Sequence, residues 1–235
     1  MHTREHGGQR TAGGAETDCA LCPVARRCWG DVLSSTENVR ARRELPLERG
    51  APLLRQGQRG GAVYLVVGGC LILRERLSDG ATRVVGLRLP GELVGVEGYA
   101  TGTQPYTAEA ASETTLCRLT LPPRGAGRAN AALLERLLCK CAAQVERAAP
   151  PWAGLPAVER VAAFLDNYAQ RAQAKAGAAE RFNLPMTRAE IGSYLGLATE
   201  TVVRALGQLR GAQRLSVRGR SVCLAENGSQ AVPPG

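Results

Sequence analysis

The sequence predicts an α+β protein of two domains joined by a long helix. Residues 45–121 alternate between short apolar runs and glycine turns, as in a β-rich domain. From Ala131 the apolar residues recur at spacings of three and four, which is typical of a helix. Residues 187–224 resemble two short helices followed by two short strands, a winged helix-turn-helix. A chain of 235 residues can bury the cores of two such domains.

The two ends of the chain are polar and are expected to be disordered tails, over residues 1–18 and 227–235. The first tail lacks the apolar stretch of a secretory signal. No apolar run of about 18 residues occurs, so no membrane-spanning helix is predicted. We therefore expect a cytoplasmic protein whose eight cysteines are thiols or metal ligands rather than disulfides.

The formal net charge is +9, from 30 Lys and Arg against 21 Asp and Glu. A basic surface binds a phosphate backbone by releasing counterions, which favours a nucleic-acid partner. The same charge would also suit an anionic membrane or simple solubility. No hydrolase or transferase arrangement of residues is present, so an enzyme is not predicted.

Three cysteines near the N-terminus, Cys19, Cys22 and Cys28, follow the spacing C-x2-C-x5-C. Thiolates on such a compact loop can bind one metal centre, and they suit both zinc and iron–sulfur clusters. Either centre needs a fourth ligand. The spacing alone does not choose between a structural zinc and a cluster.

Residues 63–67 and 71–77 are the strongest strand signals of the β-rich region. Residues 78–80, Ser-Asp-Gly, follow the second strand and should close a hairpin. Further glycine turns, such as residues 57–61, divide the rest of the region into short strands.

A helix expected over residues 129–149 carries an apolar seam about two and a half heptads long. The seam includes Leu134, Leu138, Cys141 and Val145, and it is typical of a helix that pairs with a second helix, as in a dimer. An amphipathic helix buried within one subunit would show the same pattern over so short a stretch. Pro150 and Pro151 should end this helix, and a domain over residues 155–226 begins with another helix at residues 157–171.

The helix-turn-helix pattern begins at Thr187 and Glu190, which have the spacing of a capping box. Gly196 should end the first helix in a tight turn. The second helix exposes a polar face that contains Thr199, Glu200, Val203 and Arg204. A solvated helical hairpin would fit this pattern equally well. The two strands that follow, joined around residues 218–220, favour a winged helix-turn-helix whose Arg218 and Arg220 reach phosphate.

The segment IGSYLGLATETVVRALGQL at residues 191–209, the strand pair after it and the β-rich region before it resemble the CRP/FNR superfamily of bacterial transcription regulators. The resemblance extends from Cys19 to about Leu224. It implies a β-roll sensor domain of the cyclic-nucleotide-binding type over residues 19–128. It also implies a dimerisation helix and a homodimer that binds double-stranded DNA. Residues 78–82 resemble a surface that contacts RNA polymerase in the family, and an ordinary solvated surface loop would fit them as well.

The FNR-type, oxygen-sensing branch holds a [4Fe–4S] cluster on three N-terminal cysteines at this spacing and one distant cysteine. Residues 108–119 match the branch's pattern, which puts the fourth ligand on Cys117. Read alone, Cys117 would be a small buried residue of a strand. The resemblance therefore implies a cluster, and a thiol-based or zinc-containing regulator of the same fold is the alternative. The other four cysteines, Cys70, Cys139, Cys141 and Cys223, resemble packing residues.

Cyclic-nucleotide members of the superfamily use a glutamate in a Gly-Glu pair and a nearby Arg-Ser pair that grips the phosphate. Residues 91 and 92 match the first pair, but residues 101–107 contain no arginine. A buried phosphate would then lack its counter-charge. The sequence therefore argues against a cyclic nucleotide as ligand.

Glu200 and Arg204 occupy positions that read the core of the half-site in CRP-type and FNR-type proteins. Arginine can donate to guanine O6 and N7, and glutamate can accept from cytosine N4. A surface ion pair between the two is the alternative. Val203 replaces the serine usual in FNR-type proteins and can touch a thymine methyl, and Thr199 replaces an arginine of CRP-type members. We expect a palindromic FNR-like site with a GA core.

The resemblance implies a redox-gated dimer. An intact cluster ties the loop at residues 19–28 to Cys117 and favours pairing of the helices, and its loss to oxygen, or to nitric oxide, weakens DNA binding. The sequence gives little support to an iron–sulfur electron carrier, because the chain shows no second cluster motif or nucleotide fingerprint.

Overall fold

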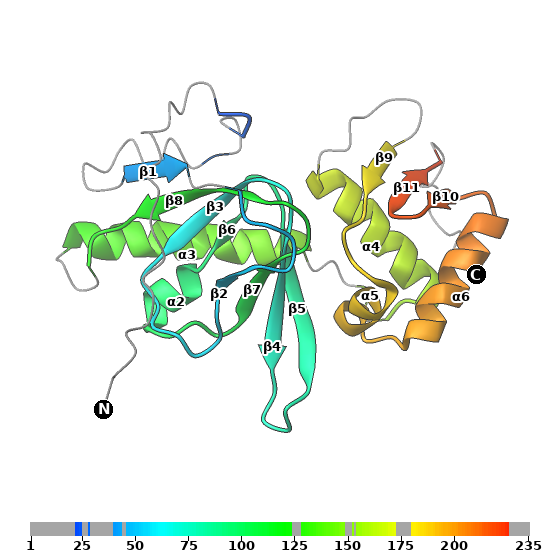
Figure 1. Cartoon of the computed structure of the whole chain (residues 1–235), viewed down its shortest axis with the longest axis horizontal. Helices are drawn as coiled ribbons and strands as arrows, with labels where there is room; N and C mark the ends of the chain where they lie inside the picture. Colours follow the sequence, from blue (N-terminus) through cyan, green and yellow to red (C-terminus); the bar gives the residue numbers. More distant parts are fainter. Residues whose placement is uncertain are drawn as a thin grey trace, which may run out of the picture.

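The computed structural model describes residues 22–24, 28, 40–43, 46–123, 128–148, 152, 154–172 and 180–225. The predictions for the two tails and for Cys19 lie outside these residues. Within them the α+β architecture is confirmed, with a β-roll, a long helix beside it and a winged helix-turn-helix (Figure 1).

The β-roll consists of two four-stranded antiparallel sheets. The first has the order β1 (Arg40–Arg43), β8 (Thr115–Thr120), β3 (Val63–Gly68) and β6 (Leu93–Val94). The second has the order β2 (Pro52–Leu54), β7 (Thr107–Ala110), β4 (Leu71–Arg76) and β5 (Thr82–Arg88). The predicted hairpin is confirmed, because β4 and β5 pair across a turn in which Gly80 has a φ of 85°. β5 is the outer strand of its sheet.

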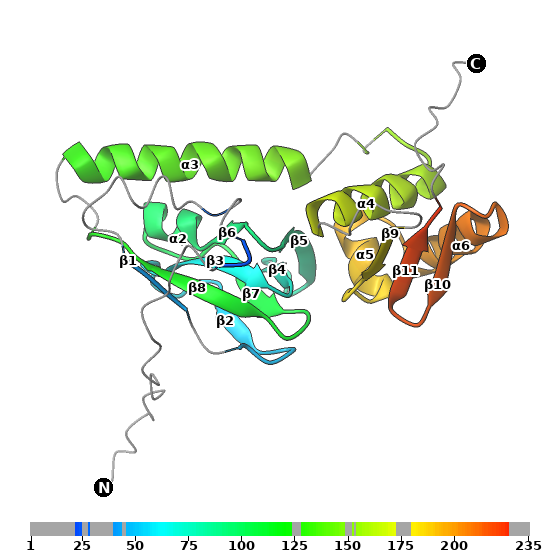
Figure 2. The same cartoon turned by 90° about the horizontal axis from the view of Figure 1, so that it is seen from above.

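Two helices accompany the roll: the short α2 (Val96–Thr101), which lies between β6 and β7, and the long α3 (Arg128–Ala148), which follows β8. α3 runs along the roll on the side of α2, as Figure 2 shows. One stripe of α3 is buried, and it consists of Leu133, Leu137, Cys141, Gln144 and Ala148. A neighbouring stripe leaves Leu138 41% and Val145 48% exposed. The helix therefore both covers the roll and presents an apolar strip.

The C-terminal domain contains three helices and a three-stranded sheet. Its elements are α4 (Ala157–Ala172), β9 (Glu180–Asn183), α5 (Arg188–Leu195), α6 (Thr199–Gly211), β10 (Leu215–Arg218) and β11 (Ser221–Leu224). α3 is described as far as Ala148, and the next helix begins at Ala157. Pro150 and Pro151, which are predicted to end α3, lie outside the described residues. Strand β9 is not foreseen by the sequence analysis, because its four residues gain their strand partner only from β11, about forty positions later.

Candidate DNA-binding face and cysteine site

The helix-turn-helix begins with the predicted capping box. The N–H of Glu190 donates to Thr187 Oγ1 at 3.2 Å, and the N–H of Thr187 donates to Glu190 Oε2 at 2.6 Å. Two of the four unpaired amides at the start of α5 are thereby satisfied. Gly196 ends α5 with a φ of 66°, the left-handed conformation that glycine takes without strain.

The turn between α5 and α6 is close because Gly192 has no side chain. The N–H of Leu197 donates to the carbonyl of Gly192 at 2.9 Å. A Cβ on Gly192 would lie 2.5 Å from the carbonyl oxygen of Leu197. Two arginines brace the unit from outside: Arg160 donates to the carbonyl of Leu195 at 3.1 Å, and Arg214 joins β10 to α4 through Glu159 at 2.9 Å.

Helix α6 has one buried and one exposed face. Its buried residues are Val202, Ala205, Leu206 and Leu209. The four residues predicted to face DNA, Thr199, Glu200, Val203 and Arg204, are all exposed. An apolar side chain that is 54% exposed, as Val203 is, has a surface available for a partner.

The alternative of a surface ion pair on α6 is not observed. Among the ion pairs of the part of the chain that the structure describes, none joins Glu200 to Arg204. Arg204 makes only a long contact of 3.4 Å to Thr201 Oγ1. Arg218 and Arg220 are exposed at the tip of the β10–β11 hairpin. Glu200, Arg204 and both wing arginines are thus open to a ligand.

Three of the four candidate ligand cysteines lie within one hydrophobic cluster. Cys117 is 5% exposed on β8, and half-buried Cys22 and Cys28 pack against the cluster that contains it. Buried Val24 anchors the loop, and its carbonyl accepts from the N–H of Cys28 at 2.6 Å. Cys19 lies outside the described residues. This convergence and the thiolate donor chemistry fit an iron–sulfur cluster.

The described cysteines do not by themselves form a closed metal site. Among residues with described positions, no three His, Cys, Asp or Glu side chains stand close enough to hold a metal ion. Cys70 is buried in a different cluster, and Cys141 is buried in the cluster that contains Cys117. Burial is the main cause that raises the pKa of each thiol to about 12. Neither is therefore a thiolate at neutral pH. Cys139 is exposed, so its interpretation as a packing residue is wrong.

The carboxylate of Glu92, which matches the glutamate of the family's nucleotide pocket in sequence, bonds to Arg171 of α4 and to the N–H of Leu89. One site assignment needs correction. Cys141, assigned to the dimer seam, is 6% exposed in the core beneath α3. In the seam, Leu134 is half-buried, and Leu138 and Val145 are exposed. No sequence signal marks Arg171, because its partner Glu92 is 79 positions away.

Comparisons with known proteins agree with this geometry. Residues 44–122 match the family model of the cyclic nucleotide-binding domain, and residues 159–226 match that of the Crp-like helix-turn-helix domain. The chain is 32% identical over 216 residues to the transcriptional activator protein Anr of Pseudomonas aeruginosa, covering 89% of this chain and 88% of Anr. The chain belongs to the CRP/FNR superfamily.

Other members of the superfamily extend the comparison. The fumarate and nitrate reduction regulatory protein of Escherichia coli is 26% identical over 231 residues, covering 94% of this chain and 91% of that protein. The structure of FixK2 from Bradyrhizobium japonicum superposes with a TM-score of 0.64 at 28% identity, over 80% of this chain and 93% of FixK2. The chain is a DNA-binding transcription regulator of the FNR-like branch. Across its described residues, no helix has the length and apolar character needed to span a membrane.

Proposed function

We propose that this regulator responds to oxygen or to redox state through a [4Fe–4S] cluster held by Cys19, Cys22, Cys28 and Cys117. The observation that carries the proposal is the packing of Cys22 and Cys28 against the cluster of buried residues that contains Cys117. These residues are about ninety positions apart in sequence, and the fold brings them to one hydrophobic cluster. A four-cysteine ligand set needs thiols from distant segments in one region. A bound cluster would supply the oxygen-reactive group.

The chain's own residues would connect this site to the dimer helix. Cys117 belongs to the same core cluster as Leu133 and Leu137 of α3. If a cluster joined the loop to Cys117, the loop would pack against the core residues that hold α3 on the roll. Loss of the cluster would release the loop and change that packing. Leu138 and Val145, on the exposed strip of α3, would meet a second copy in a homodimer.

The dimer would present two copies of α6 to a palindromic, FNR-like site in double-stranded DNA. Glu200 and Arg204 would read a guanine–cytosine pair, and Val203 would touch a thymine methyl. Arg218 and Arg220 of the wing would contact phosphates. Linking two half-site contacts raises the affinity well above that of either alone, so control of pairing controls occupancy. As a cytoplasmic activator, the regulator would then contact RNA polymerase.

Iron and acid-labile sulfide analysis under strict anoxia tests the cofactor. The wild-type protein should carry about four iron and four sulfide per chain. Cys117→Ala should lose most of both, because a cluster with three thiolates is poorly held. Cys139→Ala removes an exposed thiol of α3 and should leave the iron content unchanged.

Because Cys117 is buried, Cys22→Ala serves as a second variant that leaves the strand packing intact, and it should lose iron as well. A protein that binds zinc instead of iron would support the alternative, a zinc-containing regulator of the same fold. Wild-type iron content in both Cys22→Ala and Cys117→Ala would exclude the proposed ligand set.

A further inference from the structure

The C-terminal domain docks on the open edge of the β-roll. β5 is an outer strand, so its outward-facing amides have no strand partner. The N–H of Val84 on β5 donates to Ser193 Oγ of α5 at 2.9 Å. Arg74 of β4 pairs with Glu190, the capping residue of α5. One hydrophobic cluster runs through Val84 and Leu87 of the roll into the core of the C-terminal domain.

A buried ion pair lies in this contact. Arg171 of α4 grips Glu92 with two bonds, Nε to Oε1 at 3.0 Å and Nη2 to Oε2 at 2.9 Å. The side chains are 8% and 10% exposed, respectively. Burial alone would lower the pKa of Arg171, but the bonds to Glu92 and its charge outweigh burial and raise that pKa. The guanidinium therefore stays charged, and losing either partner would leave a buried charge unpaired.

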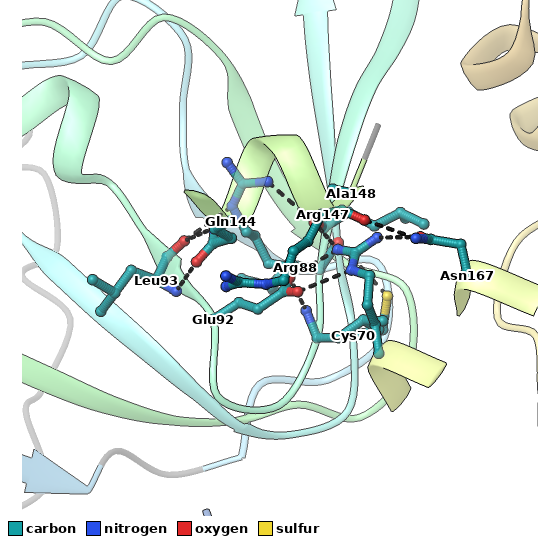
Figure 3. A network of polar contacts seen from close by, with 12 residues as sticks. Cys70, Arg88, Glu92, Leu93, Gln144, Arg147, Ala148 and Asn167 are labelled. Carbon is teal, nitrogen blue, oxygen red and sulfur yellow. Dashed lines mark hydrogen bonds and ion pairs between the residues drawn. The ribbon is translucent and has the colours of Figure 1, made fainter. Parts of the chain in front are cut away.

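The next residue, Leu93, is joined to the dimer helix. Its N–H donates to Gln144 Oε1 of α3 at 2.9 Å, and its carbonyl accepts from Gln144 Nε2 at 3.0 Å. Gln144 is 2% exposed, and Arg88 also donates to the Leu93 carbonyl, at 2.9 Å. Figure 3 shows Gln144, Leu93, Arg88 and Glu92 side by side in this network. The side-chain oxygen and nitrogen of Gln144 are both hydrogen-bonded only when α3 lies in this position. A shifted α3 would leave a buried amide unsatisfied, so this position is favoured.

We propose that Gln144, Leu93, Glu92 and Arg171 form a latch, through which the seating of α3 on the roll fixes the orientation of the C-terminal domain. Leu93 and Glu92 are adjacent, so a shift of α3 that pulls on Leu93 displaces the carboxylate that Arg171 holds. α4 and the whole helix-turn-helix then lose their buried anchor.

The latch orients the DNA-binding face and does not cover it. α5 contacts the roll, whereas Glu200, Val203 and Arg204 of α6 remain exposed in the docked arrangement. This step rests on the proposed function, in which a dimer binds a palindrome. The orientation of the C-terminal domain then matters only when two copies of α6 must fit one duplex. Releasing the latch should therefore weaken binding to a palindrome more than binding to a single half-site.

Hydrogen exchange at the Val84 amide tests the latch without DNA or cofactor. Its acceptor, Ser193 Oγ, belongs to the other domain, so its protection reports docking. Glu92→Gln and Arg171→Met should each raise its exchange rate at least tenfold. Exchange within the β3–β8 ladder should stay at the wild-type rate, which shows that the roll is folded. Glu75→Gln removes an exposed ion pair with Arg83 on the same hairpin and should change neither rate.

Gln144→Leu is the decisive variant. Both hydrogen bonds of the Gln144 side chain go to Leu93 of the roll and none goes to the described part of the C-terminal domain, and yet the variant should also raise Val84 exchange. If the Val84 amide exchanged in Gln144→Leu at the wild-type rate, α3 would not be part of the latch. If it did so in Glu92→Gln, the whole proposal would be overturned. Arg171→Lys keeps the charge but cannot make both hydrogen bonds to Glu92, so its Val84 exchange rate should lie between those of wild type and Arg171→Met. It also serves as the test if Arg171→Met fails to fold.

Titrations with a palindromic and a half-site duplex provide the DNA readout. Glu92→Gln should reduce the ratio of the two affinities at least tenfold and leave the half-site affinity within twofold of wild type. An unchanged ratio would contradict the orienting role. If the wild-type protein binds neither duplex, the proposed function fails, while the exchange rates still decide whether the latch exists.

Discussion

Glu200 and Arg204 lie one turn apart on the exposed face of α6, and the structure does not pair them with each other. Two opposite charges at this spacing gain only a few tenths of a kcal/mol from a surface pair. On the proposed function, each would gain more from a base edge in the groove, where its hydrogen-bonding geometry would be used in full. A surface pair this weak would be given up at little cost when DNA binds.

Replacing Arg204 by Ala should weaken binding to the preferred duplex by about 1–3 kcal/mol and flatten base preference at one position of each half-site. Arg218→Ala is the matched control, since a wing arginine on phosphate should weaken all sequences alike and lower the salt slope by about one. Titrations against a set of singly substituted duplexes measure both effects. Retained base preference in Arg204→Ala would exclude Arg204 from base reading.

At the residue scale, the sequence predicted what local patterns encode. The capping box at Thr187 and the turn at Gly196 follow from spacing and from glycine's conformational freedom, and the structure confirms both. The pairing of Glu92 with Arg171 follows from the tertiary fold alone. Resemblance to a family likened Glu92 to a ligand-binding residue, whereas packing of the second domain gave it another partner. Periodicity likewise assigned Cys141 to the dimer seam, although it lies one step round the helix, in the core.

At the scale of single elements, one residue of α5 both completes the capping box of the helix and holds the helix against the roll. Glu190 accepts from the N–H of Thr187 and pairs with Arg74 of the roll. Burial by itself raises the pKa of Glu190, but the bonds from Thr187 and Arg74 outweigh it, so the pKa falls below its usual 4.5. The folded state therefore prefers the carboxylate, and one side chain stabilises both a helix start and a domain contact.

The stability of the wild-type protein relative to Glu190→Gln should consequently depend on pH. Because the folded-state pKa is lowered, the carboxylate's contribution is full above about pH 4.5 and declines as pH falls through the folded value. Urea unfolding of both proteins between pH 7 and pH 3 measures the difference in free energy of unfolding. A difference that grows on acidification would contradict the assignment.

α3 has two faces with different tasks. Its buried stripe, which includes Leu137 and Gln144, seats it on the roll, and its exposed strip at Leu138 and Val145 has no partner within the described part of the chain. The 3.6-residue period revealed the amphipathic pattern in the sequence, but a period does not tell an intramolecular face from an intermolecular one. The structure separates the two faces by burial.

Leu138→Glu should leave the fold intact, because Leu138 is exposed, and should weaken dimerisation at least about tenfold, or about 1.4 kcal/mol. Sedimentation equilibrium of the anoxic protein measures it. Arg136→Glu is the control: it places a glutamate two positions away, about 200° round the helix, and changes the charge by two units instead of one, yet it should leave dimerisation largely intact. Equal dimerisation of wild type and Leu138→Glu would place the dimer interface elsewhere.

Across the whole molecule, the order of domains and the fold class were predictable, because strand alternation, helical period and turn chemistry each act over a few residues. Residues 44–122 and 159–226 match the corresponding family models. How the domains meet was not predictable. The edge of β5, the ion pair of Arg171 and the bonds of Gln144 join segments about 50 to 110 positions apart, and no local pattern records such contacts. In the proposed latch, the β-roll and the DNA-binding domain would move as one unit, and the joint would lie at Glu92 and Leu93.

The most direct test of this account is one binding titration performed twice on one anoxic preparation. Affinity for a palindromic FNR-like duplex is measured before and after exposure to air, with iron and sulfide determined at each step. Before exposure to air, we predict an iron-loaded protein that binds the duplex tightly. After exposure, the protein should have lost its iron, and its affinity for the duplex should have fallen at least tenfold. An iron-free protein that binds the duplex equally well under both conditions would contradict it.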